Sequence, residues 1–184
     1  MERGTTRSVA VGLIGAFACT PAPAVVDGTG PSGFQVTESA HIAATPDQVY
    51  AAFIQPSRWW SPAHTYSHDA ANLSLDARPG GCWCETLPGG GVQHMTVVYL
   101  APGRAVRLRG ALGPLQAMGD EGALTVEFKP ANGGTDVTLT YAVGGFAKDG
   151  FAGIASGVDG VLGEQIQRLR RSIESGSPEQ TSSR

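Results

Sequence analysis

Two cysteines alternate with a tryptophan and a glutamate in one short run of the sequence that is typical of a β-strand. In the order Cys82-Trp83-Cys84-Glu85, the tryptophan and the glutamate share one face of a strand and the two cysteines share the other, because successive side chains point to opposite faces. One of the two pairs must face the interior. If that pair contains Glu85, its carboxyl group lies in an apolar pocket; in the reverse register Glu85 is solvated.

A histidine and a methionine are neighbours on the next β-like run, residues 92–100. We expect one of the two, His94 or Met95, to face inward. His94 is a candidate proton carrier, although a lone histidine on a strand is more often a surface residue or a satisfied core residue. An inward Met95 provides a deformable wall for an irregular ligand.

Further metal-ligating atom types occur in residues 63–72, which we interpret as a loop. His64 and His68 would share a face only on a helix, and this segment has no helical period. The chain has no Cys-x-x-Cys pair, metalloprotease helix, phosphate loop or dinucleotide fingerprint. We therefore predict neither a metal site nor a cofactor.

Strand-length runs separated by glycine- and proline-rich turns dominate the middle of the chain. They predict an antiparallel meander, because short turns join neighbouring strands. Leu124, Val126 and Phe128 alternate with polar residues, which indicates one buried face and one solvated face. A first strand begins at Phe34, and the later runs are residues 73–77, 82–87, 92–100, 104–109, 123–129 and 135–143.

Helical patterns precede and follow these runs. Thr45-Pro46-Asp47-Gln48 is typical of a helix start with a capping box, and Pro56 interrupts the stretch that follows, so two short helices are predicted after the first strand. Near the C-terminus, apolar residues from Val158 to Ile173 recur every three or four positions and predict a long amphipathic helix.

The two patterns together predict an α+β fold, in which a curved antiparallel sheet of about six to seven strands wraps around the long C-terminal helix. The first half of that helix contains Gly153, Gly157, Gly160 and Gly163. Each glycine costs helix stability, so these positions either let the helix approach the sheet closely or leave room for a ligand.

The composition is that of one globular domain, because 41% of the 184 residues are hydrophobic and 16% are charged. The formal net charge of −3 argues against a nucleic-acid partner. We expect a polar linker at residues 25–33, the folded domain at 34–174 and a disordered tail at 175–184. The oligomeric state stays open.

Residues 1–24 have the pattern of an export signal, with two arginines before an apolar run and small residues after it. The apolar run is residues 9–18, about half of the roughly 20 residues that cross a bilayer, so no transmembrane span is predicted. Cys19 follows a weak lipoprotein-type cleavage box. Simple export to the periplasm or outside, lipidation at Cys19 and an uncleaved disordered arm are the alternatives.

An exported protein raises the question of disulfides. Cys82 and Cys84 would have Cα atoms about 6 to 7 Å apart on a regular strand, near the upper limit for bridging. A strained local disulfide is therefore the alternative to two free thiols.

The chain resembles the activator-of-heat-shock-protein-90-ATPase-like proteins of the START and birch-pollen-allergen (SRPBCC) helix-grip superfamily over residues 34–174. The resemblance rests on residues 45–50, which open the first helix, on Trp59-Trp60-Ser61-Pro62, where the family has Trp-Trp-Gly-Pro, and on residues 75–81. It implies a helix-grip fold with a hydrophobic cavity between the sheet and the last helix. Members of the superfamily use the cavity for lipids, hormones, polyketides or cyclisation chemistry, so the fold alone names no ligand.

The resemblance also implies that Trp83 and Glu85 face the cavity, which would raise the pKa of Glu85 and suit it to acid/base work. Of Trp59 and Trp60, adjacent helical positions about 100° apart, we expect one to pack structurally and the other to touch the cavity. The predicted cavity-lining residues are Trp59, Trp60, Tyr66, Trp83, Met95, Tyr99, Tyr141, Phe146 and Phe151.

Three functions compete at this stage. The first is the binding or carriage of a small hydrophobic molecule in the cell envelope. The second is a cofactor-independent cyclase, dehydratase or isomerase in which Glu85 with His94 or His64 moves protons. The third is a protein-interaction module, which would have an exposed apolar patch in place of an enclosed cavity.

Overall fold

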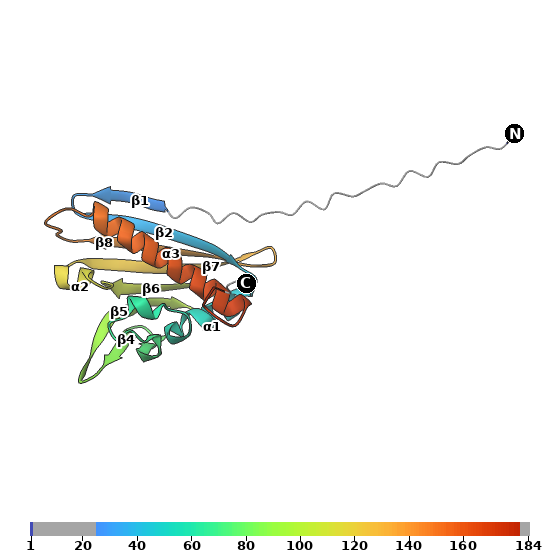
Figure 1. The fold of residues 1–184 in the computed structure, drawn as a ribbon, viewed down its shortest axis with the longest axis horizontal. Helices are drawn as coiled ribbons and strands as arrows, with labels where there is room; N and C mark the ends of the chain where they lie inside the picture. Colours follow the sequence, from blue (N-terminus) through green and yellow to red (C-terminus); the bar gives the residue numbers. More distant parts are fainter. Residues whose placement is uncertain (2–24, 181–184) are drawn as a thin grey trace.

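The structure is a computed structural model that describes Met1 and residues 25–180. Residues 25–180 form a sheet with a long helix lying across one face (Figure 1). The eight strands follow the order β1-β2-β8-β7-β6-β5-β4-β3, and each neighbouring pair is antiparallel. In chain order the elements are β1 (Val25–Gly30), β2 (Gly33–Ile42), α1 (Pro46–Phe53), the 3₁₀ turns η1 (Pro56–Arg58), η2 (Pro62–His64) and η3 (Ala70–Asn72), β3 (Leu73–Leu75), β4 (Cys82–Leu87), β5 (Gly90–Ala101), β6 (Ala105–Gly110), α2 (Leu115–Met118), β7 (Glu121–Ala131), β8 (Gly134–Gly144) and α3 (Ala152–Glu174).

The alternating residues of β7 and β8 form the floor beneath the helix. On β7 the side chains of Leu124, Val126 and Phe128 are buried, and on β8 those of Val137 and Leu139 are buried. Burial at every second residue follows from the pleat of the strand. The apolar stripe of α3 covers this surface, so the predicted α+β fold with a curved antiparallel sheet and a long C-terminal helix is confirmed.

The first helix begins as its sequence predicts. Gln48 N donates to Thr45 Oγ1 over 3.4 Å, and Thr45 N donates to Gln48 Oε1 over 3.0 Å, which completes a capping box. The helix ends before Pro56. Beyond it, the predicted second short helix is instead a series of 3₁₀ turns, η1 and η2, each opened by a proline.

The predicted linker contains a strand. Residues 25–30 form β1, which pairs with β2 through Val26↔Val36 and Gly30↔Gly33 and raises the strand number to eight. Glycines in this segment suggested a flexible connection, but an edge strand tolerates them because it has a neighbour on one side only. The two-residue connection to β2 is too short to be anything except a hairpin.

A connection between two strands and the C-terminal tail both contain structure that the sequence patterns did not predict. The connection between β6 and β7, residues 111–120, contains the short helix α2. Described residues of the predicted disordered tail contact α3: Arg168 Nη2 donates to Glu179 Oε1 and Arg171 Nε donates to Pro178 O, both over 2.8 Å. The predicted export signal with Cys19 lies outside the described residues. Among the described helices, none has the length and apolar character needed to cross a membrane.

Candidate functional site

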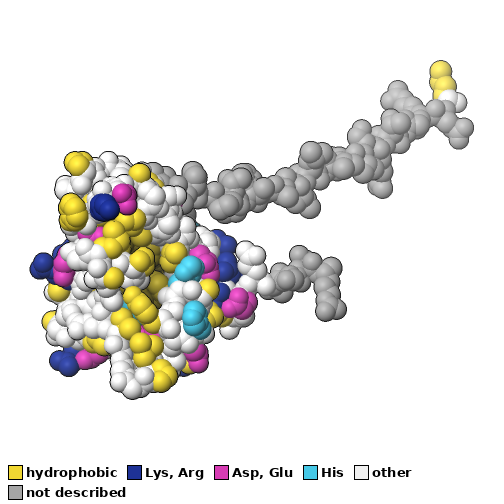
Figure 2. Space-filling model, turned by 60° about the vertical axis from the view of Figure 1, so that its left-hand side comes forward, with side chains coloured by type: hydrophobic (Ala, Val, Ile, Leu, Met, Phe, Trp, Pro, Cys, Tyr) yellow, Lys and Arg dark blue, Asp and Glu magenta, His cyan; other side chains and the backbone are white. Residues whose placement is uncertain are grey.

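An apolar cavity of about 630 Å³ lies beside the first half of α3. On one side α3 contributes Ile154, Val158 and Val161, and Gly157 leaves this wall thin. The opposite wall comes from residues 60–66, from β3, β4 and β5, and from the connection at residues 112–114. Figure 2 shows hydrophobic side chains gathered in a strip along one face of the molecule, with histidine side chains beside it.

The glycines of α3 have two separate roles. A Cβ on Gly153, Gly157 or Gly160 would meet no atom within 4 Å, so these positions are open. A Cβ on Gly163 would lie 3.1 Å from Glu38 Oε1, so here the helix does approach the sheet closely. Both explanations offered by the sequence therefore apply, at different positions of one helix.

Two tryptophans form an apolar corner of the cavity. The rings of Trp60 and Trp83 are perpendicular, at 87°, with centroids 5.1 Å apart. Trp60 Nε1 donates to His64 O over 3.0 Å, which fixes the ring. Trp59 turns away into the core, where it stacks on Phe53 and donates to Phe53 O. As predicted, one of the adjacent tryptophans packs structurally and the other lines the cavity.

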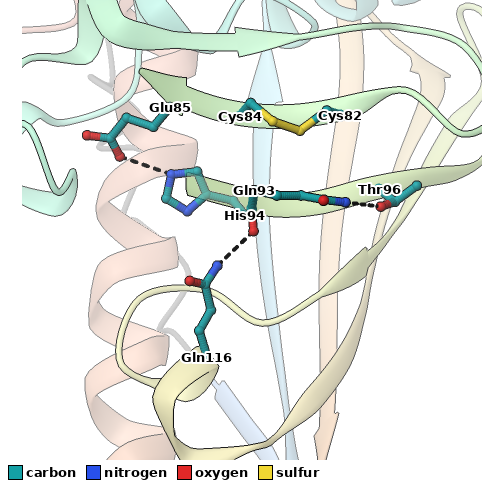
Figure 3. The surroundings of a disulfide bond; sticks show 7 residues. All are labelled: Cys82, Cys84, Glu85, Gln93, His94, Thr96 and Gln116. Atoms are coloured by element: carbon teal, nitrogen blue, oxygen red, sulfur yellow. Dashed lines mark hydrogen bonds and ion pairs between the residues drawn. A yellow bond between two sulfur atoms is a disulfide. The ribbon is translucent and has the colours of Figure 1, made fainter. Parts of the chain in front are cut away.

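A buried carboxylate and a buried histidine meet behind this wall (Figure 3). His94 Nε2 lies 3.0 Å from Glu85 Oε2, and both side chains are almost fully excluded from solvent. Backbone N–H groups of Tyr66 and Ser67 also donate to the Glu85 carboxylate. Glu85 therefore joins strand β5 to the 65–67 segment that borders the cavity.

An irregularity in strand pairing allows His94 to reach Glu85. Trp83 is opposite Met95 while Cys84 is opposite Gln93, so His94 is the extra residue of a β-bulge. Both His94 and Met95 are buried, and the prediction that only one of them faces inward is wrong. The bulge also explains Gly110, where a Cβ would lie 2.5 Å from His94 O.

The pKa of Glu85 is shifted downward, whereas an upward shift was predicted from the sequence. Burial raises the pKa of this carboxyl group, but hydrogen bonds from Ser67, Tyr66 and His94 outweigh it and hold the pKa below its usual value. Burial lowers the pKa of His94, against the pull of the Glu85 carboxylate. The pair at neutral pH is therefore an ionised carboxylate beside a neutral imidazole.

Two further candidates lie at the edge of the cavity. His64 Nε2 lies 3.1 Å from Glu164 Oε2 on α3, with about a third of the histidine side chain exposed. The Tyr66 hydroxyl donates to Gly113 O over 2.9 Å, and its ring lies 5.9 Å from the ring of His94. The first contact joins the 62–66 segment to α3, and the second joins it to the connection at residues 112–114.

Six residues predicted as cavity walls lie elsewhere. Trp59, Met95, Tyr141 and Phe151 are buried in the surrounding core, and Tyr99 and Phe146 are exposed. Tyr99 faces out because the register shifts again between Val97 and Tyr99. Tyr141 acts indirectly: its hydroxyl accepts from Leu112 N and donates to Gly110 O, both over 3.2 Å, which holds the connection that carries the cavity wall.

Apart from His64, His94 and Gly157, sequence reasoning missed the cavity residues outside the aromatic set. The 112–114 wall carries no recognisable motif. The apolar stripe of the last helix was the only sequence signal for its three cavity residues, Ile154, Val158 and Val161. Such a stripe predicts burial, but it does not distinguish a residue packed in the core from one that lines a cavity.

Cys82 and Cys84 form a disulfide (Figure 3). Because side chains alternate along the strand, Trp83 and Glu85 lie on its other face. Their Cα atoms are 5.4 Å apart, inside the usual range for a disulfide and shorter than the spacing of a regular strand. Between residues 25 and 180, no group of three or more His, Cys, Asp or Glu side chains is arranged to hold a metal ion.

A curved antiparallel sheet that holds a long C-terminal helix over an apolar cavity defines a helix-grip protein of the START-like superfamily. The chain belongs to the polyketide cyclase/dehydrase and lipid transport family, whose model matches residues 33–174. No curated protein matches the chain.

Solved structures show the same fold. The conserved protein of unknown function EF2215 from Enterococcus faecalis is 12% identical with a TM-score of 0.60, over 86% of this chain and 82% of its own. The Aha1 dimer from Colwellia psychrerythraea is 19% identical with a TM-score of 0.57, over 77% of this chain and 97% of its own. Mll3558 from Rhizobium loti is 27% identical with a TM-score of 0.50, over 73% and 95%.

Proposed function

We propose that the protein binds and carries a small hydrophobic molecule in the cavity beside α3, after export to the cell envelope. The observation that carries the proposal is the cavity itself, which has about 630 Å³ of space and predominantly apolar walls. Pockets of this size and character are typical of small-molecule sites. The family description names lipid transport as well as cyclase and dehydratase chemistry, so carriage lies within its range.

Native mass spectrometry of the protein purified from its own host tests the proposal, followed by denaturing extraction of anything bound. We expect a stoichiometric apolar molecule, and the intact mass of the same sample reports whether the export segment has been removed. A protein that carries nothing and responds to no hydrophobic probe would favour the interaction module over the carrier.

Two glycines of α3 provide a matched pair of variants. Gly157 lines the cavity and Gly153 does not, yet a side chain at either position meets open space. Gly157→Leu fills the cavity and should weaken binding of a fluorescent hydrophobic probe by about tenfold or more, whereas Gly153→Leu should bind as the wild type does. Both replacements should stabilise the helix by about 0.5–1 kcal/mol. Equal binding by the two variants would place the ligand elsewhere.

A second candidate function is proton transfer on a bound substrate. The 3.0 Å contact between His94 and Glu85 favours it, because a carboxylate that orients a neutral imidazole is an arrangement that general bases use. Once a ligand is known, Glu85→Gln should keep its affinity and lose turnover if the pair is catalytic. Retained turnover would leave carriage as the function.

A further inference from the structure

The disulfide between Cys82 and Cys84 lies where a reagent in solution can approach it. Both cysteines are half-buried, whereas Trp83 between them is only 2% exposed. Because side chains alternate along β4, the two sulfur atoms lie on the face opposite the cavity-lining Trp83. A thiolate from outside can therefore reach the S–S bond without entering the cavity.

This crosslink constrains very little of the chain. Both cysteines belong to β4 and one residue separates them, so the disulfide joins no two elements of the described fold. The stability that a disulfide provides by restricting the unfolded chain grows with the length of the loop that it closes, and this loop is very short. The bond therefore acts chiefly on the local geometry of β4.

The disulfide shortens β4 where the pairing with β5 is irregular. The Cα atoms of the two cysteines are 5.4 Å apart, compared with roughly 6 to 7 Å for two steps of a regular strand. Cys82 pairs with Thr96, and Cys84 pairs with Gln93. Three steps of β5 thus face two steps of β4, and the extra residue is His94.

A hydrogen bond on β5 spans the same paired segment. Gln93 Nε2 donates to Thr96 Oγ1 over 2.6 Å, and Figure 3 shows this bond beside the disulfide on the neighbouring strand. If the S–S bond opens, Cys82 and Cys84 can separate toward the spacing of a regular strand. Their partners on β5 must then move with them or lose their pairing.

The Glu85–His94 pair is attached to this segment through both of its members. Glu85 directly follows Cys84, and His94 is the extra residue of the bulge. Their 3.0 Å contact joins two side chains that are almost fully excluded from solvent. A change in the pairing of β4 with β5 therefore moves His94 relative to the Glu85 carboxylate.

We propose that the Cys82–Cys84 disulfide is a reversible redox site whose oxidation state controls the contact between His94 and Glu85. A dithiol reductant supplies the two electrons: one of its thiolates attacks a cysteine sulfur, the S–S bond breaks, and the released thiolate takes up a proton. The second thiol of the reductant then displaces the other cysteine, which leaves two protein thiols and an oxidised reductant. The reaction needs no ligand in the cavity, so it stands apart from the proposed function.

Dithiothreitol at high concentration, added to the folded and oxidised protein, tests the reaction. Trapping with iodoacetamide and mass spectrometry of the peptide that contains both cysteines measure the rate at which thiols appear. We expect this rate to exceed the rate of global unfolding, extrapolated from urea to water, by about tenfold or more. Glutathione disulfide should then restore the crosslink. Thiols that appear only as fast as the protein unfolds would overturn the proposal.

Imidazole ¹⁵N NMR on the same samples tests the link to His94. Its signals should shift on reduction and return on reoxidation. His41 is the internal control, because it lies on β2 and contacts Asp136 of β8, away from β4. Unchanged His94 signals in the reduced protein, or equal shifts of both histidines, would overturn the proposal.

A double variant, Cys82→Ser with Cys84→Ser, separates the crosslink from the reagent. Its His94 signals should match those of the reduced wild type and should not respond to dithiothreitol. Signals that match the oxidised wild type would show that the crosslink does not control His94, and would overturn the proposal.

Discussion

At the scale of single residues, Glu38 is a buried acid outside the cavity. It lies on β2 beneath α3 and is only 6% exposed, and among the described residues its Oε1 has no hydrogen-bond partner. Burial and the neighbouring Asp159 carboxyl group raise the pKa of Glu38 to about 7. This residue therefore holds a proton in the folded state at a pH where the unfolded chain has lost it.

The raised pKa predicts that folding stability depends on pH. The contribution of protonated Glu38 is fully present below about pH 4.5, declines as the pH rises to about 7 and is gone above that. Glu38→Gln should remove this decline, with a difference of up to about 3 kcal/mol between pH 5 and pH 8. Urea unfolding across this range measures it, with Glu121→Gln at an exposed site as the control. Parallel pH curves for wild type and Glu38→Gln would contradict the assignment.

The Glu85–His94 pair shows where sequence reasoning stops at this scale. The alternation of side chains predicted that Trp83 and Glu85 share one face of the strand, the family resemblance selected that face as the inward one, and both side chains are buried. The wrong direction for the Glu85 pKa arose because the donors that stabilise its carboxylate, the backbone N–H groups of Tyr66 and Ser67, are 19 and 18 residues away in the sequence. Backbone groups leave no mark on residue type, so no pattern could reveal them.

At the scale of elements, the contact between the Tyr66 hydroxyl and Gly113 O joins two connections across the cavity edge. This hydrogen bond must break if the connections separate to admit a ligand. Tyr66→Phe removes it at a cost of about 1 kcal/mol. We expect ligand association and dissociation to accelerate together by about fivefold in stopped-flow measurements, with little change in equilibrium affinity.

Tyr99→Phe is the matched control, because Tyr99 is exposed to the same extent, 47%, but lies outside the cavity. Its exchange rates should equal those of the wild type. If Tyr66→Phe also left both rates unchanged, ligands would enter by another route.

Elements were predictable where a local pattern sets them. The capping box of α1, the alternation in β7 and β8, and the apolar stripe of α3 all depend on residues within a few positions of each other. Strand β1 and the bulge at His94 were missed because they depend on pairing with a partner strand. The register shift at His94 and the one between Val97 and Tyr99 explain why the side chains of His94 and Tyr99 do not face as simple alternation along β5 predicts.

At the scale of the whole molecule, the fold follows from two apolar surfaces that need each other. The inner face of the sheet and the stripe of α3 bury one another along most of the helix. Beside the first half of α3 the cover is incomplete, because small residues replace large ones there, and this is where the cavity lies. The cavity is thus a region of the core that the sequence leaves unfilled.

The open glycine at position 157, which lines the cavity, has an evolutionary consequence. A change from this glycine to a larger residue other than proline needs no compensating mutation, since the new side chain meets open space and improves helix propensity. Descendants of this chain can therefore acquire new ligand preferences through single steps that do not first pass through an unstable intermediate. A helix wall of this kind makes substrate range one of the easiest properties of the protein to change under selection.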